Sequence, residues 1–222
     1  MEREILMTDD GSVTIHLPEW NEQYHSKHGA IAEAIHVFIE AGLEHWILKN
    51  PKHEISILEI GFGTGLNAFL TCLEATKKDL QIHYSGIEAY PISGEEIRQL
   101  NYASLLNASE ESFLKLHQSN WGISSEISQN FTLSKREQFF SEIKDSNLYN
   151  VIFFDAFGAR VQPELWTESI FKLMFEALKP NGVLVTYSAK GSVRRAMQAV
   201  GFSVERLPGP PGKREMLRAT RV

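Results

Sequence analysis

The sequence predicts an α/β protein built on a doubly wound sheet. From residue 51 onward, short apolar runs typical of buried strands alternate with helical patterns, and a glycine-rich stretch follows the first run. The last two predicted strands, 202–209 and 214–222, have no helix between them, which adds an antiparallel member. We therefore expect a sheet of seven strands that is mostly parallel, with one antiparallel strand.

Residues 1–50 are predicted to form an extension of this domain. EILM and VTIHL flank the turn TDDGS, and this pattern is typical of a β-hairpin. Apolar residues then recur at helical spacing from Ile31 to Trp46, so a helix follows the hairpin. We expect an N-terminal hairpin and helix in residues 1–50 and the main domain in residues 51–222.

The main domain is expected to contain five strands before the final pair. ISILEIG and IHYSGIEA predict the first two, NFTLSK a weaker third, and NVIFFDAF and VLVTYSA the fourth and fifth. Ser93 and Glu96 have the spacing of a capping box. The helices are expected over residues 66–76, SGEEIRQLNYASLL, EQFFSEIK, PELWTESIFKLMFEALKP and KGSVRRAMQAVG.

The composition describes an acidic chain with a basic end. The formal net charge is −6, yet residues 190–222 hold eight Lys or Arg against two Glu. This asymmetry favours an edge that faces a polyanion, with a solvated face as the alternative. Cys72 is the only cysteine, so we expect no disulfide framework. The chain shows neither a signal-peptide core nor a run of about 18 apolar residues, and we expect a cytoplasmic protein without a membrane segment.

The stretch LEIGFGTGLN carries the first functional signal. Gly61, Gly63 and Gly65 follow a strand and open a helix, where the backbone can turn tightly and approach a ligand. Residue 66 is Leu, which departs from the dinucleotide pattern G-x-G-x-x-G. The pattern E-x-G-x-G-x-G, which begins at Glu59, resembles the S-adenosyl-L-methionine loop of class I methyltransferases. A purely structural tight turn is the alternative.

Two further features agree with that resemblance. Glu88 ends the second strand, where a carboxylate can accept hydrogen bonds from both hydroxyls of a ribose. LKPNGVLV is close to the L-x-P-G-G-x-L phrase that precedes strand five of these enzymes. The resemblance implies a Rossmann-like fold and S-adenosyl-L-methionine as cofactor, with S-adenosylhomocysteine as product.

A narrower resemblance covers the chain from about Tyr24 to Ala219. YHSKHGAIAEAIHVF, LEIGFGTGLN, FFDAFGARVQPELWT and KGSVRRAMQAVGFSVERLPGPPGKREML are similar to the methyltransferase domain of the MnmC family. The chain is too short for that family's FAD-dependent oxidase domain, so it resembles the stand-alone, MnmD-like form. The resemblance implies N-methylation of the 5-aminomethyl group of wobble (2-thio)uridine in tRNA, giving the 5-methylaminomethyl form. It also implies tRNA as partner, with a separate FAD-dependent oxidase or upstream wobble-uridine enzymes.

Asp155 ends the fourth strand in FFDAF and is the expected catalytic residue. On the sheet edge shared with the glycines, its carboxylate can hydrogen-bond the substrate amine and accept its proton as a general base. A loop-fixing aspartate is the alternative. The family resemblance implies that Tyr24, Ser26, Glu33 and His36 close over the methionine end of the cofactor. The expected cofactor-binding residues are Glu59, Gly61, Gly63, Gly65, Asn67, Glu88, Tyr24 and Ser26.

Substrate contacts are expected from aromatic and basic side chains. Phe157 and Trp166 are candidates for apolar walls around the base, with ordinary packing as the alternative. The basic C-terminal segment is expected to contact tRNA phosphates, and the wobble base to splay out into the pocket. The expected substrate- or RNA-binding residues are Phe157, Trp166, Lys190, Arg194, Arg195, Lys213 and Arg214. Lys213 and Arg214 belong to the family-like GKREML, so a place beside the active site is the alternative for them.

Two departures from the family pattern bear on the site. Lys135 and Arg136 follow strand three, where class I enzymes often place an acid near the adenine, which leaves Glu137 or the backbone for that contact. GPPG also replaces the family's GFG before KREML.

Three other functions stay open at this point. A small-molecule amine methyltransferase or a spermidine-synthase-like transferase needs no basic C-terminus. A non-catalytic RNA-binding relic of the fold needs no Asp155. We expect no metal site, because no set of carboxylates or cysteines completes one around His25, His28, His36 and His45.

Overall fold

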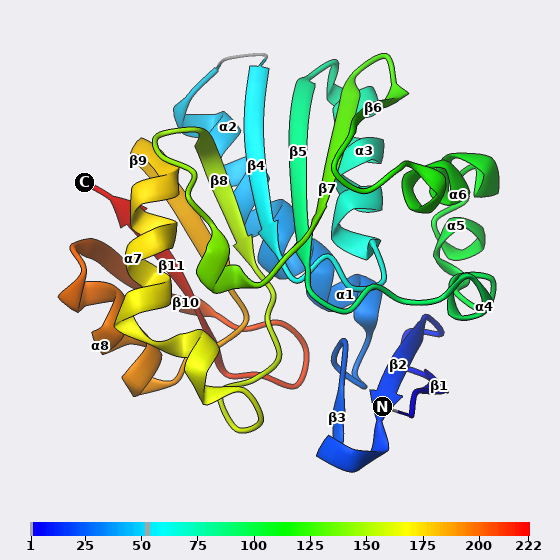
Figure 1. The fold of residues 1–222 in the computed structure, drawn as a ribbon, viewed down its shortest axis with the longest axis horizontal. Coiled ribbons are helices and arrows are strands. Elements are labelled where there is room, and N and C mark those ends of the chain that lie inside the picture. Colours follow the sequence, from blue (N-terminus) through cyan, green and yellow to red (C-terminus); the bar gives the residue numbers. More distant parts are fainter. Residues whose placement is uncertain (1, 52–53) are drawn as a thin grey trace.

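The computed structural model describes residues 2–51 and 54–222, which form a large and a small β-sheet flanked by helices (Figure 1). The small sheet has the order β1-β2-β3, with strands β1 (Glu4–Met7), β2 (Val13–Leu17) and β3 (Glu22–Gln23). The strands of the large sheet are β4 (Glu54–Ile60), β5 (Gln81–Glu88), β6 (Ser124–Ser128), β7 (Phe131–Glu137), β8 (Tyr149–Phe154), β9 (Leu178–Thr186), β10 (Phe202–Pro208) and β11 (Glu215–Arg221).

The predicted α/β fold is confirmed, and the large sheet has one strand more than the seven expected. Its order is β10-β11-β9-β8-β4-β5-β7-β6. Strand β11 runs antiparallel between β10 and β9, as the final pair of strands predicts. The additional strand, β6, is antiparallel to β7 at the other edge. Its sequence, SSEIS, is polar apart from Ile127, so it lacks the apolar pattern of a buried strand.

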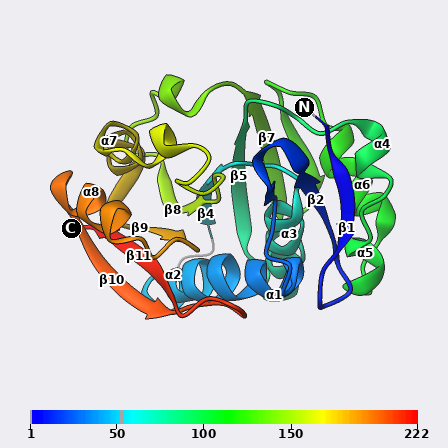
Figure 2. The same cartoon turned by 90° about the horizontal axis from the view of Figure 1, so that it is seen from below.

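Helices cover both faces of the large sheet (Figure 2). Successive side chains of a strand point to opposite faces of the sheet, so each face has its own hydrophobic core. Ile57 and Phe153 lie on the face that the N-terminal helix covers, and Leu58 and Phe154 lie on the opposite face. The helices are α1 (Ala30–Ala34), α2 (His45–Lys49), α3 (Leu66–Lys78), α4 (Gly94–Ile97), α5 (Tyr102–Leu105), α6 (Glu110–Gln118), α7 (Glu168–Ala177) and α8 (Gly191–Ala199), with the π-helical segment η2 (Ile35–Glu44) and the 3₁₀ turns η1 (Pro18–Trp20), η3 (Phe140–Glu142) and η4 (Pro163–Trp166).

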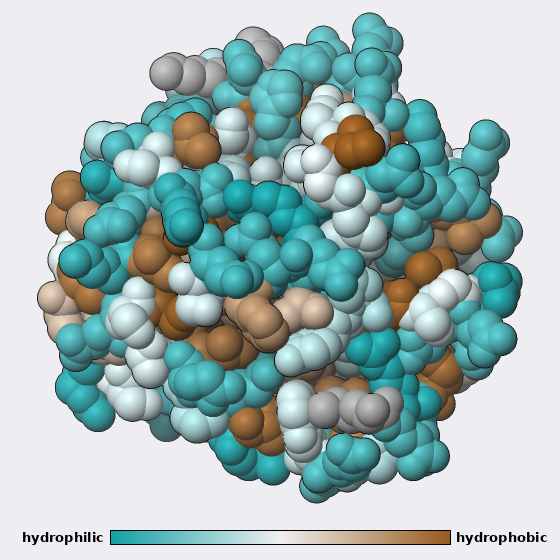
Figure 3. Space-filling view, in the orientation of Figure 1, coloured by the Kyte–Doolittle hydropathy of each residue, from teal (hydrophilic) through white to brown (hydrophobic). Residues whose placement is uncertain are grey.

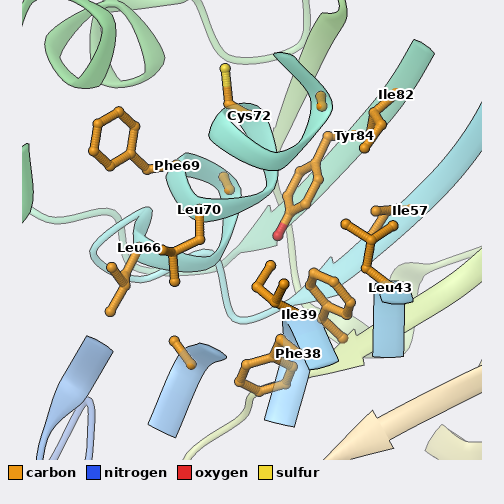
Figure 4. Packing of buried hydrophobic residues seen from close by; sticks show 14 of the residues in the cluster. Phe38, Ile39, Leu43, Ile57, Leu66, Phe69, Leu70, Cys72, Ile82 and Tyr84 are labelled. Carbon is orange, nitrogen blue, oxygen red and sulfur yellow. The ribbon is translucent and has the colours of Figure 1, made fainter. Parts of the chain in front are cut away.

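The first core lies between the N-terminal helical segment, α3 and the sheet. Phe38 and Leu43 come from η2, Leu70 from α3, and Ile57 and Tyr84 from the strands (Figure 4). The expected N-terminal hairpin and helix are therefore present, and this helix packs on the main sheet. The division at residue 50 stays a prediction.

Three predicted helices are shorter or divided. EQFFSEIK forms only the turn η3, because β7 continues to Glu137. SGEEIRQLNYASLL divides into α4 and α5, although the Ser93–Glu96 capping box is present. PELWTESIFKLMFEALKP divides at Thr167, whose extended backbone separates η4 from α7.

Polar residues dominate the face of the molecule seen in Figure 3, where apolar residues form small separate patches. Within the described part of the chain, no helix has the length and apolar character needed to cross a membrane.

We predict that Gly86→Ala destabilises the fold. A Cβ at Gly86 would lie 2.4 Å from Cδ2 of Phe62, a ring that is only 3% exposed. Because the ring is packed in the core, the overlap should lower the free energy of unfolding by about 1–3 kcal/mol in urea denaturation. The matched control is Gly94→Ala, whose Cβ would meet only Arg98 Nη1 at 3.6 Å. Equal stability of the two variants would contradict this packing.

Candidate active site

A cavity of about 1480 Å³ opens at the carboxyl ends of the parallel strands. Its floor comes from residues at or just beyond the ends of β4, β5, β7, β8 and β9. These residues are Gly61, Glu88, Glu137, Asp155 and Tyr187. The N-terminal segment, the loop after β8 and the loop between β10 and β11 form the walls. Ligands of open α/β sheets bind at this edge.

Two glycines of the loop, Gly61 and Gly63, lie in the cavity lining. A Cβ at Gly61 would lie 2.6 Å from the carbonyl oxygen of Asp155, and the φ of Gly61 is +90°, so a side chain is excluded there. Gly63 also lines the cavity, where its Cβ would lie 3.1 Å from the Tyr24 ring. Gly65 lies outside the cavity lining and caps α3 in a left-handed conformation, so its expected contact with the cofactor is not direct.

Glu88 is held by the backbone at the end of β5. Its Oε2 accepts a hydrogen bond from the Gly63 N–H at 3.0 Å, and its Oε1 accepts one from the Tyr90 N–H at 2.9 Å. Each carboxylate oxygen can accept a second hydrogen bond. Glu88 therefore presents an oriented pair of acceptors in the cavity lining.

Asn67 joins two carboxyl groups beneath the cavity. Its Nδ2 donates to Glu59 Oε1 and to Asp155 Oδ2, both at 2.9 Å. Glu59 is fully buried and lies outside the cavity lining, and its expected contact with the cofactor stays a prediction. Burial raises the pKa of Glu59 well above its usual value. Glu59 orients Asn67, which lines the cavity.

Asp155 lies at the floor of the cavity, and its pKa is close to neutral pH. Burial, with a smaller contribution from the charge of Glu33, raises its pKa from 3.8 to about 7. The hydrogen bond from Asn67 and the charge of Lys213 act in the opposite direction. A carboxyl group with a pKa near 7 can take up and release a proton at neutral pH.

A second charged pair lies in the same cavity. Lys213 Nζ donates to Glu33 Oε1 and lies 3.9 Å from the centre of the Tyr187 ring. The backbone N–H of Ser26 donates to Glu33 Oε2 at 2.7 Å. Ser26 and Lys213, two expected site residues, are thus brought together through Glu33. The position of Tyr187, at the end of β9, was the only sequence signal that could have identified it.

Aromatic rings form one wall of the cavity. The Phe157 ring packs edge-on against Tyr24 at 4.9 Å and Trp20 at 5.8 Å between ring centres. The sequence analysis did not identify Trp20. Trp166 is 5% exposed and lies outside the cavity lining, a position that agrees with the alternative of ordinary packing. Its Nε1 donates to the carbonyl of Phe157 at 2.7 Å, and it therefore supports that wall from the core.

The expected basic residues divide into two groups. Lys190 and Lys213 line the cavity, whereas Arg194, Arg195 and Arg214 lie outside its lining. Three basic residues that the sequence analysis missed, Arg3, Lys27 and Arg160, also line it. Arg160 Nη2 donates to the carbonyls of Trp20 and Asn21 at 3.0 and 2.8 Å and pairs with Glu22, which fixes the loop after β8 to the N-terminal segment.

Lys135 and Arg136 do not line the main cavity. Lys135 Nζ donates to the carbonyl of His117 at 2.7 Å and lies 4.9 Å from the centre of the Trp121 ring. Arg136 pairs with Asp145 at 2.8 Å. Glu137 does line the cavity, and the expectation that Glu137 or the backbone contacts the adenine stays a prediction.

The histidines have local partners. Nδ1 of His25 lies 3.2 Å from Thr14 Oγ1, and burial lowers the pKa of His25 to about 4. His28 lies 3.0 Å from Asp9, and His36 lies 2.9 Å from the carbonyl of Pro208. Within residues 2–51 and 54–222, no three His, Cys, Asp or Glu side chains are grouped so that they could hold a metal ion.

Comparison with known sequences identifies related proteins. Residues 102–222 match a family described as S-adenosyl-L-methionine-dependent methyltransferase. The tRNA 5-methylaminomethyl-2-thiouridine biosynthesis bifunctional protein MnmC of Leptospira borgpetersenii is 30% identical over 213 residues, which cover 89% of this chain and 32% of that protein. The chain thus spans about a third of the length of the curated relatives it matches.

Solved structures share the fold. MNMC2 from Aquifex aeolicus is 27% identical and superimposes with a TM-score of 0.76, over 99% of this chain and 70% of that one. Spermidine synthase from Thermotoga maritima gives a TM-score of 0.58 over 99% of this chain and 69% of that one. Its identity is only 15%, so it shows a common fold and no more.

We predict that Asp155→Asn changes the pH dependence of stability. Because folding raises the pKa of Asp155, its contribution to stability is complete below pH 3.8 and is lost as the pH rises through about 7. The asparagine side chain keeps an acceptor for Asn67 and has no such loss. Relative to wild type, the variant should gain about 4 kcal/mol of unfolding free energy between pH 4 and pH 8 in urea denaturation, because the pKa of Asp155 differs by about three units between the folded and unfolded states.

The matched control for this measurement is Asp79→Asn, which changes an exposed aspartate outside the cavity. This control should follow the wild-type curve. A constant offset between wild type and Asp155→Asn over the whole pH range would contradict the raised pKa.

Proposed function

The chain belongs to the S-adenosyl-L-methionine-dependent methyltransferase family, and we propose that it methylates the primary amine of 5-aminomethyl-(2-thio)uridine at the wobble position of tRNA. The product is the 5-methylaminomethyl nucleoside. One observation carries the proposal: a single cavity contains both the glycine loop with Glu88 and a carboxylate, Asp155, with a pKa near 7. The similarity to MnmC and to MNMC2 supports this choice of substrate.

The residues at the glycine loop fit the cofactor. Glu88 offers two oriented acceptors, which suit the two hydroxyls of a ribose. Gly61 and Gly63 leave room for close approach of a ligand, because a Cβ at either position would clash or crowd. S-adenosyl-L-methionine supplies an electrophilic methyl group when it is bound. Tyr24 and Ser26 line the cavity on the opposite wall and are proposed to cover the methionine end.

Asp155 is the proposed general base. An aminomethyl group is largely protonated at neutral pH, and its nitrogen is a nucleophile only after a proton leaves it. The ionised carboxylate accepts a hydrogen bond from this nitrogen, aligns it for in-line displacement and holds the proton that it releases. Asn67 fixes the carboxylate through its 2.9 Å hydrogen bond, so that the acceptor is already oriented.

The dimensions of the cavity suit a second ligand beside the cofactor. Its volume of about 1480 Å³ exceeds the roughly 300–1,000 Å³ of an ordinary small-molecule site. The aromatic wall of Phe157, Tyr24 and Trp20 offers apolar surface to a base that has been splayed out of the anticodon loop. The proposed nucleoside site therefore lies between this wall and Asp155.

Basic residues around the cavity are proposed to contact tRNA phosphates. Lys27 and Lys190 are exposed and line the cavity, so they lie where the strand that flanks the splayed base would pass. Arg194, Arg195 and Arg214 lie beyond the lining and extend the same basic region. Contacts of this kind position the RNA without reading its sequence.

The MnmC relative is bifunctional by name, and this chain spans 32% of it. We propose that a separate enzyme, such as an FAD-dependent oxidase or an upstream wobble-uridine enzyme, prepares the aminomethyl group. A tRNA substrate places the proposed reaction in the cytoplasm.

The test of the function is transfer of labelled methyl from S-adenosyl-L-methionine to tRNA that carries unmethylated 5-aminomethyluridine, followed by nucleoside mass analysis. Wild type should add one methyl group. Asp155→Asn should lower kcat by about 10²- to 10⁴-fold while the Kd for S-adenosyl-L-methionine changes by less than about threefold, because the base acts only on the amine. Transfer to small amines but not to tRNA would contradict the proposal, as would equal losses of turnover and cofactor affinity.

We predict that Glu88→Gln weakens cofactor binding. The glutamine amide has an NH₂ donor in place of one acceptor oxygen. Either a ribose hydroxyl or a backbone N–H therefore loses its hydrogen-bond acceptor. Loss of hydrogen bonds to a charged group, at about 1.5–3 kcal/mol, should raise the calorimetric Kd for S-adenosyl-L-methionine about 10- to 100-fold. The matched control is Glu126→Gln, which changes an exposed glutamate of β6 outside the cavity lining. An unchanged Kd in Glu88→Gln would remove Glu88 from the cofactor site.

A further inference from the structure

The Glu33–Lys213 ion pair joins the two ends of the chain at the cavity. Glu33 comes from α1, and Lys213 comes from the loop between β10 and β11, 180 residues later. Their side chains are 8% and 32% exposed, and both residues line the cavity that contains Asp155. A surface ion pair contributes little to stability, but a sheltered one changes the field at neighbouring groups.

Both partners are held in place by further contacts. The Ser26 N–H holds the free oxygen of Glu33 at 2.7 Å, and the face of the Tyr187 ring lies 3.9 Å from Lys213 Nζ. The Tyr187 hydroxyl in turn donates to the carbonyl of Ala156, the residue next to Asp155, at 2.8 Å. The ammonium group is therefore fixed in position relative to the backbone that carries Asp155.

Two charged groups of the cavity lining act on Asp155 in opposite directions. The carboxylate of Glu33 disfavours the ionised form of Asp155, and the ammonium group of Lys213 favours it. Asn67 is a neutral donor. Glu33, Asn67 and Lys213 act on the ionisation of Asp155. The charge of Asp155 in turn raises the pKa values of Glu59, Tyr84 and Tyr187, which pack around it.

We infer that the Glu33–Lys213 pair is a positioning device for the Asp155 carboxylate. Glu33 holds the ammonium group over Tyr187, and from that fixed place the cation stabilises the ionised, proton-accepting form of Asp155. Glu33 opposes that form by its own charge, so the two members of the pair act on Asp155 in opposite directions. The catalytic meaning of this inference rests on the proposed function, whereas its electrostatic content can be tested without a substrate.

The experiment is a titration of the Asp155 carboxyl carbon by NMR in the protein without ligand, assigned by the signal that Asp155→Asn removes. Wild type should titrate near pH 7. Lys213→Met should move the midpoint upward and Glu33→Gln should move it downward, each by about half a pH unit or more. Lys213→Arg keeps the charge and should stay within about 0.3 unit of wild type.

A purely structural cross-link gives a different result. If the ion pair were only a cross-link, Lys213→Met and Glu33→Gln would loosen the cavity in the same way. The titration midpoints of Asp155 in the two variants would then shift in the same direction or stay at the wild-type value. Either of these outcomes overturns the inference. Glu33→Gln keeps an oxygen acceptor for Lys213, so the downward shift remains measurable if Lys213→Met does not fold.

The matched controls are Lys78→Met and Glu44→Gln, which break a 2.8 Å ion pair outside the cavity lining and should leave the midpoint unchanged. The pH dependence of methyl transfer should follow the same order as the NMR midpoints. If wild type transfers no methyl group to tRNA, the proposed function fails, while the NMR shifts still decide the role of the pair.

Discussion

The amide of Asn67 is the constraint on which the site depends. Its single NH₂ group donates to Glu59 from β4 and to Asp155 beyond β8, two carboxyl groups that would otherwise face each other in a buried setting. Asn67 occupies this place because the glycine loop turns β4 sharply into α3. The cofactor loop and the proposed base are therefore parts of one hydrogen-bonded unit, and a shift in either would move the other.

The cavity is completed by segments from both ends of the chain. Arg160 fixes the loop after β8 to the carbonyls of Trp20 and Asn21 in the N-terminal segment. Lys213 reaches Glu33 from the C-terminal side. The sheet alone would supply only the floor, and the extension before residue 30 and the loop of the last hairpin add walls to this open strand edge.

Features that depend on strand ends could be predicted from the sequence. Gly61, Glu88 and Asp155 each follow an apolar run, and the carboxyl ends of parallel strands meet at one edge of the sheet whatever the packing of the helices. The Ser93–Glu96 capping box is also local, because it needs only four consecutive residues.

Features that depend on long-range packing could not be predicted. Trp166 has an apolar ring that would suit a pocket wall, but its indole N–H needs a hydrogen-bond acceptor when it is buried. The carbonyl oxygen of Phe157 is that acceptor. The Glu33–Lys213 pair joins residues 180 positions apart, so no spacing rule shows it. Strand β6 depends on pairing with β7, because its own residues are mostly polar.

The most direct test of the central claim is the rate of a single turnover of methyl transfer to aminomethyl-tRNA, measured from pH 5.5 to pH 9. If Asp155 is the base, the wild-type rate rises with increasing pH, with an apparent pKa near 7. The pH–rate profile of Asp155→Asn lacks this rise and keeps only the rise that comes from deprotonation of the substrate amine. An unchanged rise near pH 7 in Asp155→Asn would assign the proton acceptor to another group and contradict the account.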